Sequence, residues 1–429
     1  MKMFKKVALV AACSAMLGGV TMQAQAANWL MLQGTEAPDT AVRAKLWGFI
    51  QAQYQKDNSD ANGAGGYVPP KLIGPNLDSQ EAFNVNRARI GVRGTGLPLD
   101  NKVNYFLLAE LGNNGITSGS DGKILTDASI TLNHIKGARV RLGLFKTPGF
   151  EEGLQAIHVF DYINFTSVGN QLMLERHPSA SDAFDAPDPT PNASMNAYAK
   201  SVGAFRDVGV QIFDTFKSND WEHSYAVMYG NGNGLNYSDN DDNKDTYFYW
   251  SSEKVYGGKG PRREGLKMFA WTQDGKRTNV FNTSQEFDRT RSGVGVKYLK
   301  KPFRVSAEYL TGEGMIFQGQ HRPDNTHGPY NNEEADGYYV DFGYYIPGSN
   351  WELDIRYDSY TRGESHGTSA ANDESRYDTT TVGAQYHFNK KTRVNMEYSA
   401  RDFESDTPNV QAQLVGVDSR YAIQVTHIF

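Results

Sequence analysis

Only one cysteine occurs in the 429-residue sequence, and it lies at position 13. A chain with a single cysteine cannot form an internal disulfide, and no C-x-x-C-H motif for attaching c-type haem is present. The sequence also contains no G-x-S-x-G, H-E-x-x-H or P-loop motif. We therefore predict no catalytic residue, no cofactor and no metal site.

Long hydrophobic runs are also missing beyond the N-terminal region. No stretch of about 18 apolar residues is found there, which argues against a transmembrane helix. The N-terminus has lysines before the apolar run Val7–Ala12, then small residues and Ala24–Ala26. This pattern is typical of a secretory signal peptide, which we predict over residues 1–26. A lipoprotein-like box ends at Cys13, but the apolar stretch continues past it, which favours the signal peptide.

Positive charge is in the minority. The sequence has 43 Lys and Arg against 49 Asp and Glu, a formal net charge of −6. An acidic balance argues against nucleic acid as a partner. The chain is rich in aromatic residues and glycine, with 24 Tyr, 22 Phe and 43 Gly. No linker or composition break divides it, which favours one undivided structural unit.

What the sequence has in abundance is alternation with a period of two. Arg139, Arg141 and Gly143 alternate with aliphatic residues between positions 138 and 144. Because successive side chains of a strand point to opposite faces, one face here is charged and the other is aliphatic. Many short segments share this pattern within one chain, so we expect the aliphatic face to lie against lipid.

The alternating segments number sixteen between residue 45 and the C-terminus. Their connections form two sets: short ones, such as Lys300–Pro302 and Asn389–Lys391, alternate with long ones, such as 313–334 and 403–417. Bacterial outer-membrane barrels have an even number of antiparallel strands, joined by short periplasmic turns and longer extracellular loops. The sorting of connections therefore favours a barrel over a soluble sandwich.

We predict an all-β fold, a 16-stranded antiparallel transmembrane β-barrel with short periplasmic turns and long extracellular loops. The barrel is expected over residues 45–429, in the outer membrane of a Gram-negative bacterium. Residues 27–44 show no clear period and are predicted to form a periplasmic N-terminal extension. The chain ends on an alternating segment closed by Phe429, an ending typical of such barrels.

The longest irregular segment covers residues 147–204 and follows the fifth predicted strand. A long loop at that place in a barrel can fold inward, so we predict a constriction of the pore. The alternative is an extracellular lid that contacts nothing in the lumen. The segment contains Asp182, Asp185 and Asp188, whose charges would oppose the passage of anions if they reached the lumen.

Aromatic residues recur near both ends of the outward-facing sides of several strands. The pairs are six residues apart, which is roughly 20 Å along a strand at about 3.4 Å per residue. We interpret them as two interfacial girdles. The pairs are Phe303 with Tyr309, Tyr338 with Tyr344, and Trp351 with Tyr357.

Cations on the face opposite to the aliphatic one are the candidate functional residues. Rings or ladders of Arg and Lys favour anions in pores, and guanidinium groups bind phosphate-like oxyanions through paired hydrogen bonds. The alternative is that these cations brace the wall by pairing with inward acids such as Glu110, Asp127 and Glu308. The candidates are Arg87, Arg89, Arg93, Arg139, Arg141, Arg289, Arg291 and Lys297.

An acidic loop contains Asp239, Asp241, Asp242 and Asp245. Counted from Asp239, the sixth and twelfth positions are Lys244 and Trp250, where an EF-hand needs Gly and Glu. We therefore expect a solvated loop rather than a calcium site.

Several motifs resemble one known family. They are RARIGVRG at 87–94, AELG at 109–112, DASI at 127–130, ARVRLGLFKTP at 138–148, LER at 174–176, RDVGVQ at 206–211 and NGNGLN at 231–236. Together they resemble the phosphate-selective porin O and P family, over most of the chain that follows the predicted signal peptide. The resemblance implies a sixteen-stranded trimeric channel for small solutes. It does not securely imply phosphate, because relatives in this broad family differ in solute.

The expected function is passive diffusion of small hydrophilic solutes, with a preference for inorganic or phosphate-like anions. The expected partners are these solutes, outer-membrane lipid and lipopolysaccharide, and two further copies in a homotrimer. One alternative is a non-selective or cation-preferring general porin. Another is a barrel sheath for an electron-transfer cytochrome, which usually needs a wider barrel. An outer-membrane phospholipase is disfavoured by the missing serine hydrolase motif.

Overall fold

Sixteen strands build the computed structural model. The structure describes residues 29–32, 43–59, 81–96, 100–114, 116–117, 124–175, 203–236, 238–239, 241–258, 260, 262–278, 286–316, 334–363, 374–406, 411 and 414–429. The strands are β1 (Lys45–Asp57), β2 (Glu81–Thr95), β3 (Val103–Glu110), β4 (Leu125–Leu132), β5 (Arg139–Lys146), β6 (Arg206–Ser218), β7 (Trp221–Gly230), β8 (Asp245–Gly257), β9 (Glu264–Thr278), β10 (Glu286–Lys300), β11 (Phe303–Glu313), β12 (Glu334–Tyr345), β13 (Trp351–Arg362), β14 (Ser375–His387), β15 (Thr392–Ser405) and β16 (Arg420–Ile428).

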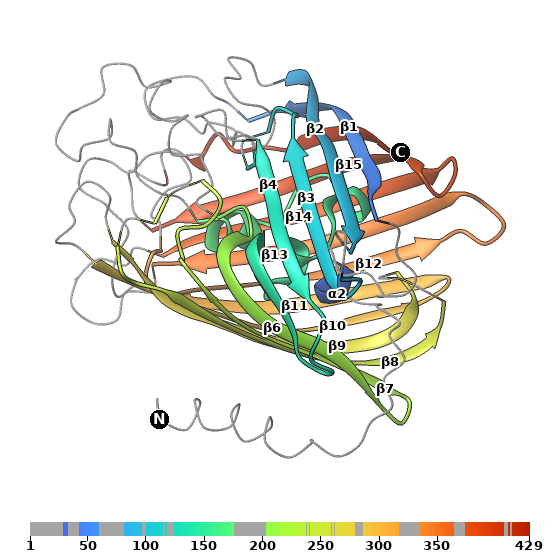
Figure 1. The fold of residues 1–429 in the computed structure, drawn as a ribbon. Coiled ribbons are helices and arrows are strands. Elements are labelled where there is room, and N and C mark those ends of the chain that lie inside the picture. The colour runs from blue at the N-terminus through green and yellow to red at the C-terminus, as the bar shows by residue number, and fades with distance from the viewer. Residues whose placement is uncertain are drawn as a thin grey trace.

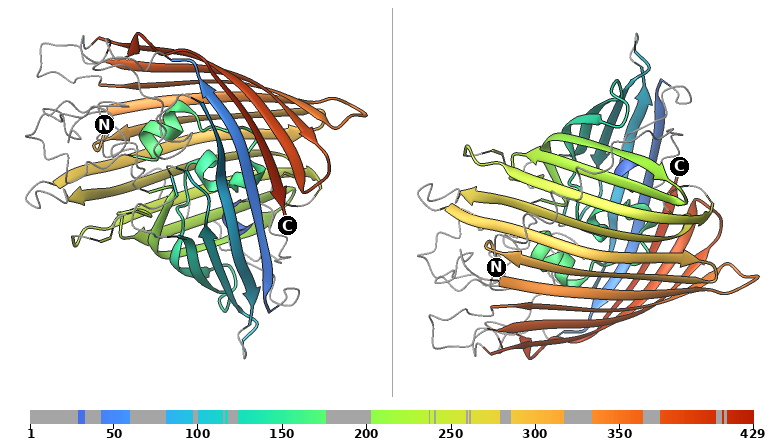
Figure 2. Two further views of the ribbon diagram at one scale, coloured as in Figure 1. Left: turned by 90° about the horizontal axis from the view of Figure 1, so that it is seen from above. Right: turned by 90° about the horizontal axis from the view of Figure 1, so that it is seen from below.

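Every strand pairs with its neighbours in the sequence, and the first strand pairs with the last (Figures 1 and 2). The closing pair β1–β16 runs antiparallel from Phe49 opposite Ile428 to Asp57 opposite Arg420. Closure leaves no sheet edge, which a barrel in lipid requires because unpaired backbone groups are costly there. The predicted 16-stranded antiparallel barrel is confirmed.

The connections separate the barrel into two ends. At the short-turn end, Asn219 and Asp220 alone separate β6 from β7, and Lys301 and Pro302 alone separate β10 from β11. At the opposite, long-loop end, the chain between β5 and β6 runs from residue 147 to 205. β1 begins and β16 ends at the short-turn end. Short and long connections therefore alternate along the chain, as predicted.

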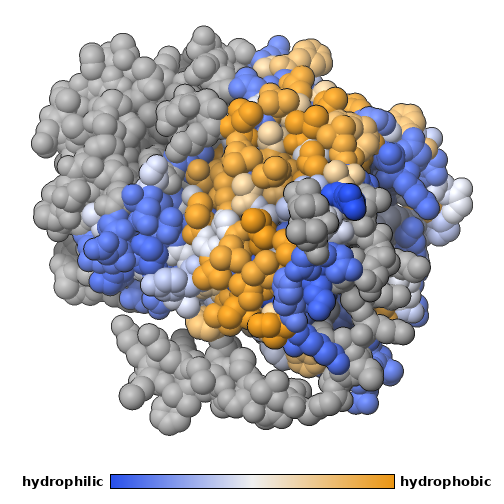
Figure 3. All heavy atoms as spheres, in the orientation of Figure 1, coloured by the Kyte–Doolittle hydropathy of each residue, from blue (hydrophilic) through white to orange (hydrophobic). Residues whose placement is uncertain are grey.

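Exposure alternates along the strands and gives the barrel an apolar outside. Leu142 is 43% exposed, whereas its neighbour Arg141 is fully buried on the inner side. In β2 the alternation shifts where an extra residue, Asn86, stands between Val85 and Arg87 opposite the continuous partner strand β1. Figure 3 shows an apolar band across the middle of the visible wall, between polar ends.

The outward aromatic residues lie at two levels. Phe303 is opposite Tyr344 near the short-turn end, with ring centroids 5.6 Å apart. Six residues along β11, Tyr309 is opposite Tyr338, whose ring lies 6.0 Å from that of Tyr357. These two levels correspond to the predicted interfacial girdles.

The lumen is occupied in part by chain that is not strand. Between β5 and β6 the described segment contains α3 (Glu151–Leu154), a 3-10 turn η1 (Ile157–Val159) and a π-helical turn η2 (Gly169–Met173). Both views in Figure 2 place this green segment within the ring of strands. No helix in the described part of the chain is long and apolar enough to cross a membrane.

A second short helix, α2 (Trp29–Leu32), also lies inside the barrel. Trp29, Leu30 and Met31 are buried in one cluster with inward residues such as Phe213 and Phe269. The sequence predicts a periplasmic extension for residues 27–44; of these, residues 29–32 form this helix, and most of the others lie outside the described residues. The sequence pattern of these consecutive apolar residues does not predict which surface they contact. Packing against the inner aromatic side chains removes them from water, which stabilises this position.

Candidate functional site

The inward segment is held by its apolar face. Phe150, Leu154, Val168 and Leu172 are buried in the same cluster as the inward-facing Trp271. These side chains come from the two ends of the segment. Their burial fixes α3 and η2 against the wall of β8 to β13.

Wall carboxylates bind the segment through its backbone. Glu308 on β11 accepts a hydrogen bond from the Glu151 N–H at 3.1 Å. Glu397 on β15 accepts one from the Ile163 N–H at 2.8 Å, and Asp358 on β13 accepts one from the Ser167 N–H at 2.6 Å. Because these three acceptors come from three different strands, they anchor the segment along much of its described length.

Wall cations bind the backbone carbonyl groups of the same segment. Lys146 Nζ donates to the carbonyl oxygens of Gly153 and Gln155 at 2.7 and 2.5 Å. Arg291 donates to the Leu172 carbonyl at 3.3 Å, and Arg393 donates to the Phe160 carbonyl. The segment is therefore placed by its main chain from opposite sides of the lumen.

The eight predicted pore cations fall into two groups by their partners. In the first group each cation is paired with a carboxylate. The pairs are Arg89 with Glu110 at 2.7 Å, Arg139 with Asp214 at 3.3 Å, Lys297 with Glu151 at 3.2 Å, and Arg289 with Glu175 and with Asp245, the latter at 3.0 Å.

The second group consists of Arg87, Arg141, Arg291 and Arg93, and the hydrogen bonds of the first three go to neutral atoms among the described residues. Arg87 donates to Gln51 Oε1 at 3.1 Å. Arg141 donates to Thr131 Oγ1 at 3.4 Å and lies over the Phe213 ring at 4.4 Å. Arg291 donates to a row of carbonyl groups, with the Glu175 carboxylate at 3.7 Å, and Arg93 lies over the ring of Phe106.

Several lumenal cations were missed by the sequence analysis, Arg304, Arg356 and Arg393 among them, and two more lie at strand ends. Lys146 and Arg206 are opposite each other at the ends of β5 and β6, where the chain leaves and rejoins the wall. Strict alternation assigns both to the outer face. Both side chains nevertheless point inward: Lys146 Nζ donates to the Gln155 carbonyl, and Arg206 pairs with Asp127 at 3.1 Å.

Arg87, Arg89, Lys146 and Arg206 together form what we call the basic wall. They line one cavity of about 300 Å³ and interact electrostatically with one another. The carboxylates that pair with members of this group are Glu110 and Asp127. The basic wall therefore holds more positive than paired negative charge.

The opposite side of the lumen has the reverse balance. Asp341, Glu352 and Asp354, on β12 and β13, all accept hydrogen bonds from Arg304, and we call them the acidic wall. Asp161 of the inward segment joins this group through Arg262, 2.6 Å away in the β8–β9 turn. The acidic wall lies toward the short-turn end, whereas Lys146 and Arg206 lie at the long-loop end.

Ionisation within the inward segment differs from residue to residue. Burial raises the pKa of Glu152 to about 7, although Arg356 and the Thr166 hydroxyl oppose this rise. Burial also opposes ionisation of Asp161, but Arg262 and Arg304 outweigh it and lower its pKa. Burial lowers the pKa of His158 to about 3, which keeps that imidazole neutral.

The segment rejoins the wall through a strained backbone. Ala204 and Phe205 have φ of +44° and +61°, in the left-handed region. Non-glycine residues held there cost about 1–3 kcal/mol each and persist only where the surroundings determine them. The strain places the Phe205 ring 5.6 Å from that of Phe150 and directly against Gly153, where a Cβ would lie 2.6 Å from the ring.

The acidic loop is used for local structure. Asp241 accepts hydrogen bonds from the backbone N–H groups of Asn243 and Thr278, and Asp239 pairs with Lys244 at 3.1 Å. Within the described ranges, no group of three or more His, Cys, Asp or Glu residues is arranged to hold a metal ion.

A closed barrel with an apolar outside and a charged lumen is the architecture of an outer-membrane channel. A family model described as Gram-negative porin matches residues 8–406, and the chain belongs to this family. The protein is therefore a porin of the outer membrane, as predicted. Comparison with curated protein sequences gives no match.

Solved porin structures share the fold. The anion-selective porin from Comamonas acidovorans aligns with a TM-score of 0.54 and 14% identity, over 90% of this chain and 99% of that one. Salmonella typhi OmpF in complex with daunomycin aligns with a TM-score of 0.51 and 16% identity, over 91% of this chain and 100% of that one. The outer membrane channel DcaP of Acinetobacter baumannii aligns with a TM-score of 0.50 and 12% identity, over 93% of this chain and 100% of that one. At these identities the similarity concerns the fold alone.

Proposed function

We propose that this porin conducts small hydrophilic solutes passively and prefers anions, phosphate-like oxyanions among them. The observation that carries the proposal is the basic wall. Within the described residues, the hydrogen bonds of Arg87 and Lys146 go to neutral oxygen atoms. Their charges are therefore not cancelled by a bonded carboxylate, and cations lining a pore favour anions.

The segment 147–204 narrows the path beside this wall in our proposal. Support comes from residues 150–173, which are anchored to the inner faces of β11, β13 and β15. Residues 176–202, with Asp182, Asp185 and Asp188, lie outside the described residues. If the pore is narrowest beside the basic wall, a solute passes closer to that wall than to any other part of the lumen.

A cation-preferring porin is the second candidate, and the acidic wall favours it. Asp341, Glu352 and Asp354 share the single guanidinium of Arg304 and add Asp161 from the inward segment. Most of this negative charge is bound to Arg304 and Arg262 in short contacts. We favour anions because the acids are held by their own cations, whereas Arg87 and Lys146 are held by neutral groups.

A homotrimer embedded in outer-membrane lipid and lipopolysaccharide is also part of the proposal. β3, β4 and β5 have eight residues each, shorter than the strands of the other walls. Their outward residues Leu107, Ile130 and Leu142 are exposed and apolar. A low apolar wall of this kind suits contact with a second copy, and mild cross-linking should give a three-subunit species.

Single-channel recording across a KCl gradient tests the ion preference. The wild-type reversal potential should indicate anion preference, most strongly at 0.1 M salt, where the Debye length is about 10 Å. The double variant Arg87→Gln/Lys146→Gln should lower the anion-to-cation permeability ratio by at least about fivefold, since even one of the two charges contributes about 1 kcal/mol near a passing ion in water.

The matched control is Lys56→Gln/Lys276→Gln, which removes the same charge from the outer face. Both lysines are about half exposed and pair with Glu81 and Glu286 there. This control should keep the wild-type reversal potential. A wild-type channel that prefers cations at 0.1 M salt would refute the anion assignment.

A further inference from the structure

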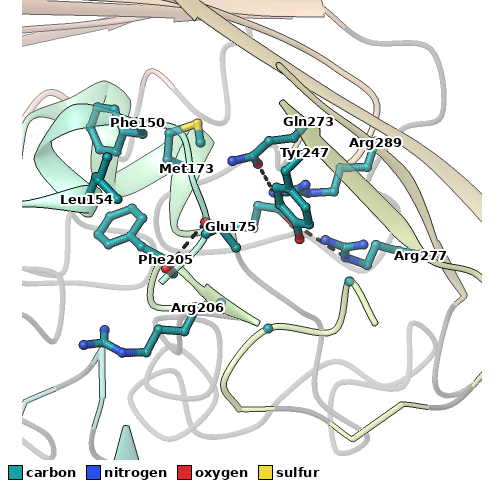
Figure 4. A pocket seen from close by; sticks show the side chains of 14 residues that line it. Phe150, Leu154, Met173, Glu175, Phe205, Arg206, Tyr247, Gln273, Arg277 and Arg289 are labelled. Atoms are coloured by element: carbon teal, nitrogen blue, oxygen red, sulfur yellow. Dashed lines mark hydrogen bonds and ion pairs between the residues drawn. The ribbon is translucent and has the colours of Figure 1, made fainter. Parts of the chain in front are cut away.

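A cavity on the long-loop side of the inward segment has two unlike sides (Figure 4). The space between these two sides, counted together with the part open to solvent, is about 450 Å³. Phe150, Leu154 and Phe205 form the apolar side. Arg277 and Arg289 face them from β9 and β10, and Arg206 lies at the base.

Phe205 is placed for contact rather than for burial. Its ring is only half-buried, unlike Phe150 and Leu154, which are buried. The left-handed backbone at Ala204 and Phe205 holds the ring in this position. Such strain clusters at binding sites and other functional positions, because the surrounding structure must maintain it.

The guanidinium side has a spare donor. Arg277 is 5% exposed, and both its Nη atoms bind Asp245, at 2.9 and 3.0 Å. Its Nε has no hydrogen-bond partner among the described residues, and the nearest carboxylate oxygen, on Glu175, is 3.9 Å away. A buried N–H without an acceptor is costly, so an acceptor atom of a bound solute would complete this side.

Arginines outnumber acids among the residues that line the cavity. Three guanidinium groups and one carboxylate, Glu175, line it. The carboxylates that pair with Arg206 and Arg277, Asp127 and Asp245, are not among the lining residues. A solute in the cavity therefore meets the guanidinium groups before it meets those acids.

We propose that this cavity binds small organic anions with an apolar body, such as aromatic carboxylates. The carboxylate lies against Arg277 and Arg289, and the apolar body packs against Phe205 and Phe150. Inorganic phosphate has no apolar body and contacts only Arg277 and Arg289. This inference rests on the proposed anion-conducting function and names a solute class for it.

Block of the single-channel chloride current by benzoate, acetate and phosphate tests the inference on the full-length protein. Benzoate and acetate carry the same carboxylate and charge and differ in the ring. Benzoate should reach half-block at a concentration about two- to tenfold lower than acetate, the range expected for one aromatic contact. Equal half-blocking concentrations in the wild type would overturn the proposal.

Two variants locate the site. Phe205→Leu should abolish the advantage of benzoate over acetate, whereas Phe403→Leu, which changes a buried inner aromatic residue on β15, should keep it. Arg277→Gln should raise the half-blocking concentrations of both carboxylates, whereas Arg263→Gln, at the short-turn end, should leave them unchanged. Phe150→Leu replaces Phe205→Leu if that variant does not assemble. Retention of the benzoate advantage without the Phe205 ring would refute the assignment.

The reversal potential measured in the same recordings separates this inference from the proposed function. An anion-preferring channel that shows no benzoate advantage refutes the cavity alone. A cation-preferring channel in which benzoate block still depends on Phe205 refutes the proposed ion preference and leaves the cavity assigned.

Discussion

The basic and acidic walls of the lumen both consist of inward-facing strand residues, yet their charges are held differently. In the acidic wall, Asp341, Glu352 and Asp354 converge on one guanidinium, that of Arg304. In the basic wall, Arg87 is held by an amide and Lys146 by carbonyl groups. In the first arrangement the carboxylates are bound to a cation, whereas in the second Arg87 and Lys146 are bound to neutral oxygen atoms among the described residues.

The largest expected effect comes from removing the hub of the acidic wall. Arg304→Met leaves three buried carboxylates without their shared partner, and breaking such a pair destabilises a protein by about 3–5 kcal/mol. Arg87→Gln loses one hydrogen bond to an amide and should destabilise by about 1–3 kcal/mol. Urea unfolding, followed by heat-modifiable mobility on gels, measures both. Equal losses would show that the two walls do not differ as described.

An intermediate effect is expected from pH, through Glu152. This residue lines the cavity of the basic wall and also pairs with Arg356 at 3.2 Å. Because its pKa is raised from 4.5 to about 7, it is neutral at pH 5.5 and negative at pH 8.5. Anion preference should therefore be stronger at pH 5.5, and the reversal potential should shift toward cations as pH rises through about 7.

The variant Glu152→Gln should remove this pH dependence. Its neighbour Glu151 serves as the control, because Lys267 and Lys297 outweigh the effect of burial and lower the pKa of Glu151, so that Glu151→Gln should keep the shift. The same titration affects stability. Between pH 4.5 and 7 the folded protein retains a proton that the unfolded chain has lost, so the free energy of unfolding should fall as pH rises across this window. A pH shift that survives in Glu152→Gln would contradict the assignment.

The smallest effect is expected outside both walls. Lys56 and Glu81 form an ion pair at 3.3 Å on the outer face, each about half exposed. Exposed pairs contribute about 0–1 kcal/mol. Lys56→Ala should therefore leave urea unfolding nearly unchanged, which sets the baseline for the wall variants.

The sequence alone predicts the barrel well, because strand geometry depends only on local alternation. The period of two predicts that Arg141 faces the lumen and that Leu142 faces outward. Counting the alternating segments is enough to predict that β1 pairs with β16. Alternation fails where strands end. Lys146 and Arg206 point inward against their parity, at the last pair of the β5–β6 ladder before the chain continues into the inward segment.

The partners of the candidate cations were not predictable in the same way. Arg87 and Arg89 are two residues apart on one face, yet one binds Gln51 and the other binds Glu110. Which partner each meets depends on the register of β1, β2 and β3, including the extra residue at Asn86. Register and bulges depend on the whole barrel, so a charge pattern in the sequence cannot distinguish a bracing arginine from one that faces solutes.

The backbone anchoring of the inward segment has a consequence for how the pore diversifies. Glu308, Glu397 and Asp358 bind N–H groups of the segment, which every residue except proline supplies. These three hydrogen bonds therefore do not depend on which side chain stands at positions 151, 163 and 167. A substitution at one of these positions by any residue except proline keeps the backbone donor, so this part of the anchoring tolerates a change of sequence in the segment.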